Sequence, residues 1–291
     1  MLLSPTPQRI LATLFPLLQS AAAYACRIQA QIQAQPDKGN MPNFFAAALS
    51  DADLSIQTLV EVALLGVFPE VRFFGEEYEQ SFNTPYFRSI ELGANLDDDY
   101  LVTLDPIDGT RFYLDGHSNF QIILAVLDAV KYQAVLAISP AKGEYFYSFH
   151  GQGTRQGTLD QPLEACQPLQ LSPPPATVLL GVGMQHLAER LQDQFTVISI
   201  AQDYGADTAI PNVNGILSGE LSAAVLAAGN WIDGGAIAFL AQEAGCWVSD
   251  LQGDPLPPLR NCKDKRFQGI IIATSPLEHQ QILEAIRSTT S

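Results

Sequence analysis

Basic side chains are scarce in this 291-residue sequence, which has 15 lysines and arginines against 31 aspartates and glutamates. The resulting net charge of −16 gives a surface that repels DNA, RNA and anionic lipid. We therefore expect neither a nucleic-acid partner nor a membrane partner. An anionic ligand would need a local source of positive charge, and a bound metal ion is such a source.

Cysteine and histidine are also rare, with four of each. The cysteines lie far apart and form no C-x-x-C pair: they are Cys26, Cys166, Cys246 and Cys262. This spacing argues against a disulfide framework and predicts reduced thiols in a cytoplasmic protein. The histidines are equally scattered, which argues against a zinc hydrolase.

Long apolar runs are absent, and we expect no membrane-spanning stretch. The segment ILATLFPLLQSAAAYA has the apolar content of a secretory signal. However, only Arg9 precedes it with a positive charge, and Gln19 and Ser20 interrupt it. Its apolar residues recur at helical spacing, so we expect residues 8–34 to form an amphipathic helix of the folded body.

Two halves are predicted, residues 1–170 and 171–291, with the boundary at the proline-rich segment LSPPPAT (171–177). In the second half, short strands such as TVLLGVG and FTVISI alternate with helical segments, which is typical of an α/β arrangement. The helix after NWID should end where Gly245 closes it.

The first half predicts an α+β arrangement. A breaker-rich loop at 36–43 precedes a helix from about Ser50 to Leu65 and a short strand in VRFFG. The segments YLVTLDP, FQIILAVLD, YQAVLAIS and EYFYSFHG then predict an antiparallel meander. We expect the acidic loop ANLDDDY (94–100) to be solvated.

Carboxylates stand at the ends of four apolar segments. They are Asp53 on the second helix, Glu76 and Glu77 after RFFG, Asp105 and Asp108 in DPIDGT, and Asp233 in WID. Taken singly, Asp108 and Asp233 are typical of helix N-caps, and GEE is typical of a solvated turn. If these acids converge, they repel one another unless a hard divalent cation such as Mg²⁺ binds among their oxygens.

The segment DPIDGT also predicts an anion site. Pro106 stiffens the backbone after Asp105, and a tight turn then returns Asp108 to the same side. Gly109 has no side chain, so an anion can approach the backbone, and Thr110 adds a hydroxyl. If a helix begins here, its first N–H groups would face that anion.

GEE (75–77), DPIDGT (105–110) and WID…EAG (231–245) resemble, in order, the motifs of the inositol monophosphatase superfamily. These are Mg²⁺-dependent, lithium-sensitive phosphatases related to fructose-1,6-bisphosphatase. GEYFYSFHGQGTRQG, DLQGDPL and GIIIATSP match in place, so the resemblance covers nearly the whole chain. It implies a layered αβαβα sandwich of the sugar-phosphatase type with two pseudo-domains. It also implies a homodimer, a small phosphorylated metabolite as substrate, and two or three Mg²⁺ ions, with Li⁺ as an inhibitor.

The resemblance implies which residues bind metal. The expected ligands are Glu76, Asp105, the carbonyl of Ile107, Asp108 and Asp233, with Asp105 shared between two ions. Two ions about 4 Å apart can activate water on one side and stabilise the leaving alkoxide on the other.

The resemblance also implies a catalytic set and a substrate-binding set. Glu76, Asp53 and Thr110 are the expected catalytic residues, with Thr110 paired to Asp53 and orienting the attacking water. The expected substrate contacts are Asp108, Gly109, Thr110, Arg111, Thr208, Ala209 and Asp233. The reaction would be in-line hydrolysis of a phosphomonoester, dominated by positioning and charge neutralisation.

Three positions depart from the motifs. Ile232 lies between Trp231 and Asp233, although counting back from EAG still places Asp233 at the ligand position. Arg111 follows DPIDGT, where the 3′-phosphoadenosine 5′-phosphate branch tends to have a basic residue. No acid follows Glu220 before WID, where the inositol enzymes place a substrate-binding glutamate.

Alternatives therefore stay open. The activity could be that of a 3′(2′),5′-bisphosphate nucleotidase or a fructose-1,6-bisphosphatase-like enzyme, and a non-catalytic descendant would bind a phosphometabolite. Retention of the predicted ligands favours an enzyme. GADTAIP (205–211) is equally consistent with an ordinary polar turn, and Arg111 with a surface ion pair.

Overall fold

The computed structural model describes residues 4–32, 34–35, 48–79, 81–90, 99–172 and 175–288. The predicted loop at 36–43 lies outside these residues, as do parts of the segments 94–100 and 171–177.

By its internal contacts the chain divides into two compact units. The first contains residues 1–150 and 156–166, and the second contains residues 151–155 and 167–291. The two predicted halves with a boundary at residue 170 stay a prediction.

The sheet of the first unit contains the predicted meander. Its strands include β1 (Arg72–Gly75), β2 (Leu101–Asp108), β3 (Gln121–Leu127), β4 (Tyr132–Ser139), β5 (Glu144–Phe149) and β6 (Arg155–Thr158), and these follow one another in this order. β1 pairs with β2 in parallel, whereas β2 to β5 pair antiparallel. The prediction of an antiparallel meander is confirmed.

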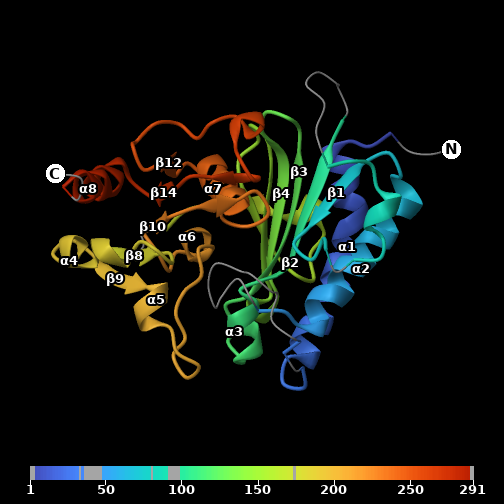
Figure 1. Ribbon diagram of the computed structural model, residues 1–291, viewed down its shortest axis with the longest axis horizontal. Helices are drawn as coiled ribbons and strands as arrows, with labels where there is room; N and C mark the ends of the chain where they lie inside the picture. Colours follow the sequence, from blue (N-terminus) through green and yellow to red (C-terminus); the bar gives the residue numbers. More distant parts are fainter. Residues whose placement is uncertain are drawn as a thin grey trace. The chain divides into compact units, whose positions relative to one another are not determined.

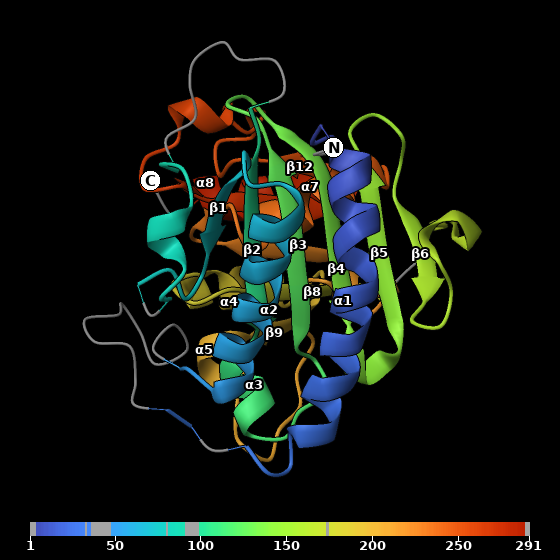
Figure 2. The same cartoon turned by 90° about the vertical axis from the view of Figure 1, so that its right-hand side faces the viewer.

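Two helices, α1 (Pro7–Ile28) and α2 (Asp51–Val67), cover one face of this sheet (Figure 2). Both begin at polar caps, Thr6 for α1 and Ser50 for α2. The predicted helix at 50–65 is confirmed within two residues. α1 ends at Ile28, earlier than the predicted end at residue 34.

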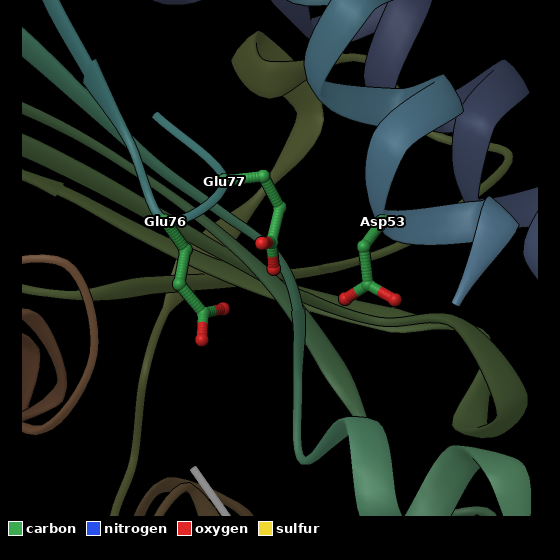
Figure 3. A group of neighbouring side chains, drawn as sticks. All are labelled: Asp53, Glu76 and Glu77. Carbon is green, nitrogen blue, oxygen red and sulfur yellow. The ribbon is translucent and has the colours of Figure 1, made fainter. Parts of the chain in front are cut away.

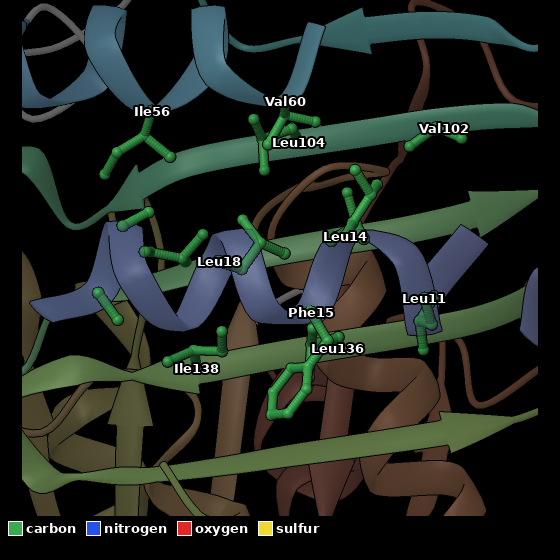
Figure 4. Close-up of a cluster of buried hydrophobic side chains, with 14 of the residues drawn as sticks. Leu11, Leu14, Phe15, Leu18, Ile56, Val60, Val102, Leu104, Leu136 and Ile138 are labelled. Carbon is green, nitrogen blue, oxygen red and sulfur yellow. The ribbon is translucent and has the colours of Figure 1, made fainter. Parts of the chain in front are cut away.

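The core of the first unit lies between the two helices and the sheet (Figure 4). Buried side chains in Figure 4 come from α1 (Leu11, Leu14, Phe15, Leu18), α2 (Ile56, Val60), β2 (Val102, Leu104) and β4 (Leu136, Ile138). Successive side chains of a strand point to opposite faces. Because Leu104 faces the helices, Asp105 points to the other face of the sheet.

By length and composition, α1 is the one helix in the described part of the chain that could cross a membrane. The expectation that no stretch is long enough is therefore wrong for α1. Its apolar face is nevertheless buried in the core of the first unit, where Ile10, Leu14 and Leu18 are fully buried. The predicted amphipathic helix of the folded body is confirmed.

The second unit is also a layered α/β structure (Figure 1). Its main sheet has the order β12 (Trp247–Ser249), β14 (Ile270–Ala273), β10 (Ala223–Leu226), β8 (Thr177–Leu180) and β9 (Thr196–Ser199). β8 pairs in parallel with β9 and β10, and β14 pairs antiparallel with β10 and β12. A mixed, layered α/β fold is thus confirmed within each unit.

The helices of the second unit pack against this sheet. α7 (Gly234–Glu243) contacts β12 and β14, and α8 (Pro276–Arg287) contacts β14 and α4 (Ala188–Leu191). The short elements are β7 (Gln167–Pro168), α5 (Ile200–Asp203), α6 (Gly215–Ser218), β11 (Gly229–Asn230) and β13 (Arg266–Phe267). All four cysteines of the chain are free thiols, as predicted.

One acid of the loop expected to be solvated is buried. Asp99 is only 7% exposed, and its Oδ1 lies 2.9 Å from Nε of Arg72. Arg88 approaches the same carboxylate oxygen at 3.5 Å. The ion pair joins the start of β1 to the residues just before β2, a contact between residues 27 positions apart that loop composition does not reveal.

Replacing Leu14 by Ala should lower the free energy of unfolding by about 2–5 kcal/mol, because the side chain is fully buried in the core. Urea denaturation measures this change. The matched control is Leu59→Ala on α2, where the same atoms are removed from a side chain that is 38% exposed, and the expected loss is below about 1 kcal/mol. Equal losses would contradict the packing of α1 into the core.

Candidate metal and phosphate site

The first turn of α2 fixes the carboxylate of Asp53, which is fully buried. Its Oδ2 accepts hydrogen bonds from the backbone N of Ser50 at 2.8 Å and from Ser50 Oγ at 2.5 Å. Ser50 Oγ in turn accepts one from the backbone N of Ala52 at 3.2 Å. This reciprocal arrangement is a capping box, and it holds one carboxylate oxygen against the helix start.

The other oxygen of Asp53 faces Thr110, the first residue of α3 (Thr110–Leu114). Thr110 Oγ1 lies 3.1 Å from Asp53 Oδ1 and 2.9 Å from the carbonyl oxygen of Ile107. A hydroxyl has one proton, so it can donate to one of these acceptors at a time. The expected pairing of Thr110 with Asp53 is confirmed, whereas its role in orienting water stays a prediction.

Gly109 joins β2 to α3 with φ 85° and ψ 38°. This left-handed conformation is accessible to glycine without a steric cost, and it lets the chain turn sharply after Asp108. The turn brings the hydroxyl of Thr110 to Asp53 in the first turn of α2. The glycine of DPIDGT is therefore required by the backbone conformation.

α3 is also hydrogen-bonded to the C-terminal end of α1. Tyr113 Oη donates to the carbonyl of Ala25 at 2.8 Å, and Gln29 Nε2 donates to the carbonyls of Tyr113 and His117 at 3.1 and 2.8 Å. Burial, and then the charge of Asp53, raise the pKa of the Tyr113 phenol above its usual value. The phenol therefore stays protonated and continues to hold α3 against α1.

Glu76 and Glu77 directly follow β1. The backbone N of Glu76 donates to the carbonyl of Leu104 at 2.9 Å, so the pairing with β2 continues one residue beyond the strand. Asp53, Glu76 and Glu77 form a close group in which each offers one carboxylate oxygen, and these oxygens lie within 4.8 Å of one another (Figure 3). Asp53 and Glu77 are buried, and Glu76 is partly exposed.

This close group fits a hard metal ion. Its donors are all anionic oxygens, the ligand type that Mg²⁺ prefers. Three carboxylates at this distance repel one another, and a divalent cation among them would cancel that repulsion. Glu76, Glu77 and Asp53 are therefore the residues that would hold it.

Asp105 lies within β2, one residue after Leu104, the partner of Gly75 in β1, and it is outside the close group. It points to the sheet face opposite Leu104 and is 3% exposed. Pro106 has no N–H to donate to the sheet, and the register of β2 against β3 shifts between Asp105 and Asp108. Metal binding by Asp105 stays a prediction.

Asp108 is held by the neighbouring strand. Gln121 Nε2 donates to Asp108 Oδ2 at 2.6 Å, and the two residues are paired in the β2–β3 register. Gly109 rather than Asp108 is the N-cap residue of α3, so the N-cap explanation does not apply to Asp108. Arg111 follows on α3 and is half-buried. The roles expected for Asp108, Arg111 and the Ile107 carbonyl stay predictions.

Asp233 belongs to the second unit, where it caps α7. One carboxylate oxygen accepts from the backbone N of Gly234, and the other accepts from Asn230 Nδ2 at 2.8 Å. The N-cap explanation therefore applies to Asp233, and it leaves metal binding open. α7 ends before Gly245, which has φ 96°, so the spacing from WID to EAG corresponds to one helix.

Two other segments of the second unit, GADTAIP (205–211) and EAG (243–245), make hydrogen bonds within the chain that are consistent with a purely structural role. Thr208 and Ala209 are exposed, and the backbone N of Thr208 donates to Gly205 O at 2.9 Å, which is the geometry of a polar turn. The carboxylate of Glu243 accepts from the backbone N of Gly151 at 2.8 Å and of Gly153 at 3.0 Å. Substrate contacts of Thr208 and Ala209 stay a prediction.

The sequence motifs assign no role to Gln57 or Gln121 and do not include Glu77 among the metal ligands. Gln57 follows Asp53 by four residues and so lies on the same face of α2, a signal that the sequence contains. Gln121 gave no local signal, because it reaches Asp108 only through the register between two strands.

The sequence profile described as the inositol monophosphatase family matches residues 17–291. The chain belongs to the inositol monophosphatase family. A relative from Neisseria meningitidis serogroup A, named as the Nus factor SuhB, is 28% identical over 167 residues. That match covers 54% of this chain and 60% of the relative, so the chain spans less than two thirds of that relative's length.

Solved structures of similar fold include an IMPase from Thermotoga maritima, with a TM-score of 0.69 at 18% identity. The similarity covers 95% of this chain and 96% of that one. An IMPase/NADP phosphatase complexed with Mg²⁺ and phosphate has a TM-score of 0.68 at 16% identity, covering 97% and 96% of the two chains. At these identities the likeness shows the inositol monophosphatase fold.

In this member of the inositol monophosphatase family, Thr110→Val should lower the free energy of unfolding by about 1–3 kcal/mol, because buried Asp53 loses a hydrogen-bond donor. Urea denaturation of the metal-free protein measures the change. Thr110→Ser keeps the hydroxyl and loses only a methyl group, so its expected cost is about 1 kcal/mol or less. If Val were as stable as Ser, the hydrogen bond to Asp53 would contribute nothing.

Proposed function

We propose that this chain is a Mg²⁺-dependent phosphomonoesterase that hydrolyses a small phosphorylated metabolite. The proposal rests on one observation: the hydroxyl of Thr110 is hydrogen-bonded to Asp53, which also belongs to the close group with Glu76 and Glu77. A group able to orient water thus lies beside carboxylates that fit a cation. Membership of the inositol monophosphatase family supports the same activity.

In this proposal, the residues of the first unit have separate roles in binding the metal ion, orienting water and binding the phosphoryl group. Bound Mg²⁺ would supply Lewis acidity that neutralises charge on the phosphoryl group and on the leaving oxygen. When the Thr110 hydroxyl donates a hydrogen bond to Asp53, its lone pairs remain available to accept a hydrogen bond from the attacking water. The amides of Gly109 and Thr110 would bind the phosphoryl oxygens.

The reaction is a hydrolysis without a change in oxidation state. The water oxygen forms a bond to phosphorus while the bond between phosphorus and the ester oxygen breaks. The ester oxygen leaves with a proton, and the products are inorganic phosphate and the free alcohol. Positioning and electrostatic stabilisation supply most of the acceleration in such a reaction.

The positive charge of Arg111 is a reason to propose a substrate that carries a second phosphate group. It directly follows Thr110 on α3, and a guanidinium can bind phosphate through charge-assisted hydrogen bonds. We include a 3′(2′),5′-bisphosphate nucleotide and fructose 1,6-bisphosphate in the substrate class for this reason. A cytoplasmic homodimer and inhibition by Li⁺ are further parts of the proposal.

A non-catalytic role is the second candidate, because the Neisseria relative is named as a Nus factor. Acids gathered at one place are destabilising once no metal is needed there, so an inactive descendant tends to lose them. This chain keeps Glu76, Asp105, Asp108, Thr110 and Asp233. Their retention favours the enzyme.

The direct test measures phosphate release from inositol monophosphate, 3′-phosphoadenosine 5′-phosphate, fructose 1,6-bisphosphate and histidinol phosphate, with Mg²⁺, with EDTA and with added Li⁺. We expect Mg²⁺-dependent release from at least one compound and inhibition by Li⁺. Release from none of them at any Mg²⁺ concentration would contradict the proposal.

The matched variant for this assay is Asp233→Asn. Asparagine caps helices as well as aspartate does, so α7 should keep its stability. Loss of the negative charge should nevertheless lower kcat by about 100-fold or more if Asp233 binds a metal ion in the assembled site. An unchanged kcat would mean that Asp233 caps α7 and does not bind a catalytic metal ion.

The effect of Mg²⁺ on stability provides a separate prediction. Mg²⁺ should raise the melting temperature of the wild type, because it binds the folded state. Glu76→Gln should remove most of that increase and should itself raise the melting temperature without metal, since it relieves repulsion within the close group. Differential scanning calorimetry measures both, and exposed Glu79→Gln is the control, expected to behave as the wild type. A wild-type response in Glu76→Gln would place the metal elsewhere.

A further inference from the structure

We propose that Gln57 is a positioning residue that fixes Glu77, and with it the acidic turn 76–77, for metal binding. This inference rests on the proposed function, because it concerns the same carboxylates. Gln57 lies on α2 between Asp53 and Glu61, and neither the motifs nor the close group includes it.

Both ends of the Gln57 amide are hydrogen-bonded. Its Oε1 accepts from the backbone N of Glu77 at 2.9 Å, and its Nε2 donates to Glu61 Oε1 at 2.9 Å. Gln57 is 2% exposed and Glu61 is 1% exposed, so water does not compete for these bonds. Because a carboxylate accepts only and an N–H donates only, the amide has a single favourable orientation.

Glu61 is itself held by the chain that follows the acidic turn. Its Oε2 accepts from Ser81 Oγ at 2.7 Å and from Asn83 Nδ2 at 2.8 Å. The backbone N of Asn83 also donates to Ser81 Oγ at 3.0 Å. The acidic turn is thus bound to α2 through Gln57, and the chain just after it is bound to α2 through Glu61.

The spacing along α2 explains why this arrangement would position a metal site. Asp53, Gln57 and Glu61 are four residues apart, so they lie on one face of the helix with a rise of about 6 Å between neighbours. Asp53 contributes to the close group directly, and Gln57 positions Glu77. The same helix therefore holds both the carboxylate of Asp53 and the backbone of Glu77 before any ligand binds.

Gly75 gives independent support. A Cβ atom at this position would lie 2.1 Å from Gln57 Oε1 and 2.5 Å from its Cδ. Gly75 ends β1, and its φ is not in the left-handed region, so the backbone does not require glycine here. The glycine of GEE therefore makes room for the amide of Gln57.

The main test exchanges the side chains of Gln57 and Glu61, which are hydrogen-bonded to each other. Gln57→Glu keeps an acceptor for the Glu77 N–H but places a carboxylate against Glu61. We expect exchange of the Glu77 amide hydrogen to be at least about 10-fold faster in the metal-free protein, and the Kd for Mg²⁺ by calorimetry to rise about 10-fold or more. The double variant Gln57→Glu with Glu61→Gln restores one donor and one acceptor, and both values should return to within about 3-fold of wild type.

Gly75 provides a second cycle that avoids a new charge. Gly75→Ala should weaken Mg²⁺ binding by about 10-fold in the wild type, because the new methyl group displaces Gln57. In a Gln57→Ala background the methyl group has room, so the same substitution should change Mg²⁺ affinity less than about 2-fold. Equal effects of Gly75→Ala in both backgrounds would overturn the explanation of Gly75.

The outcomes separate this inference from the proposed function. Unchanged Glu77 exchange and Mg²⁺ affinity in Gln57→Glu would overturn the inference, as would a wild type that binds no Mg²⁺. If both quantities change and recover as stated while no phosphomonoester is hydrolysed, the inference stands and the proposed activity fails.

Discussion

Repulsion among three carboxylates is the constraint that the first unit must meet. Asp53, Glu76 and Glu77 bring oxygens within 4.8 Å of one another, and two of the three side chains are buried. Each is held by a different interaction: Asp53 by the capping box of α2, Glu76 by continued pairing with β2, and Glu77 by Gln57. These hydrogen bonds hold the carboxylate of Asp53 and the backbone of Glu76 and Glu77 in place before a cation binds, which lowers the entropy lost on binding.

The hydroxyl beside this group depends on elements further away. Gly109 turns the chain so that Thr110 reaches Asp53, and Tyr113 and Gln29 fasten α3 to α1. α1 in turn is held by the apolar core that it shares with α2 and the sheet. The helix that could be taken for a membrane segment by composition thus supports the position of Thr110.

Local patterns in the sequence predicted the strands, whose formation depends mainly on nearby residues. The apolar segments YLVTLDP, FQIILAVLD, YQAVLAIS and EYFYSFHG predicted β2 to β5, and the resemblance predicted the pairing of Thr110 with Asp53. Contacts set by tertiary packing were beyond such patterns: Asp99 with Arg72, and Asp108 with Gln121 across two strands. The backbone of Glu77 is hydrogen-bonded to Gln57, a contact that a turn such as GEE does not reveal. The approach of Asp233 to the first unit remains a prediction.

The central claim is that the acidic turn and the start of α2 form a metal site. Anomalous diffraction from crystals grown with Mn²⁺, which prefers the same oxygen ligands as Mg²⁺, tests it most directly. We expect a peak about 2 Å from a carboxylate oxygen of Glu76, with a further ligand from Glu77 or Asp53. Manganese peaks found only away from these three carboxylates would contradict the account.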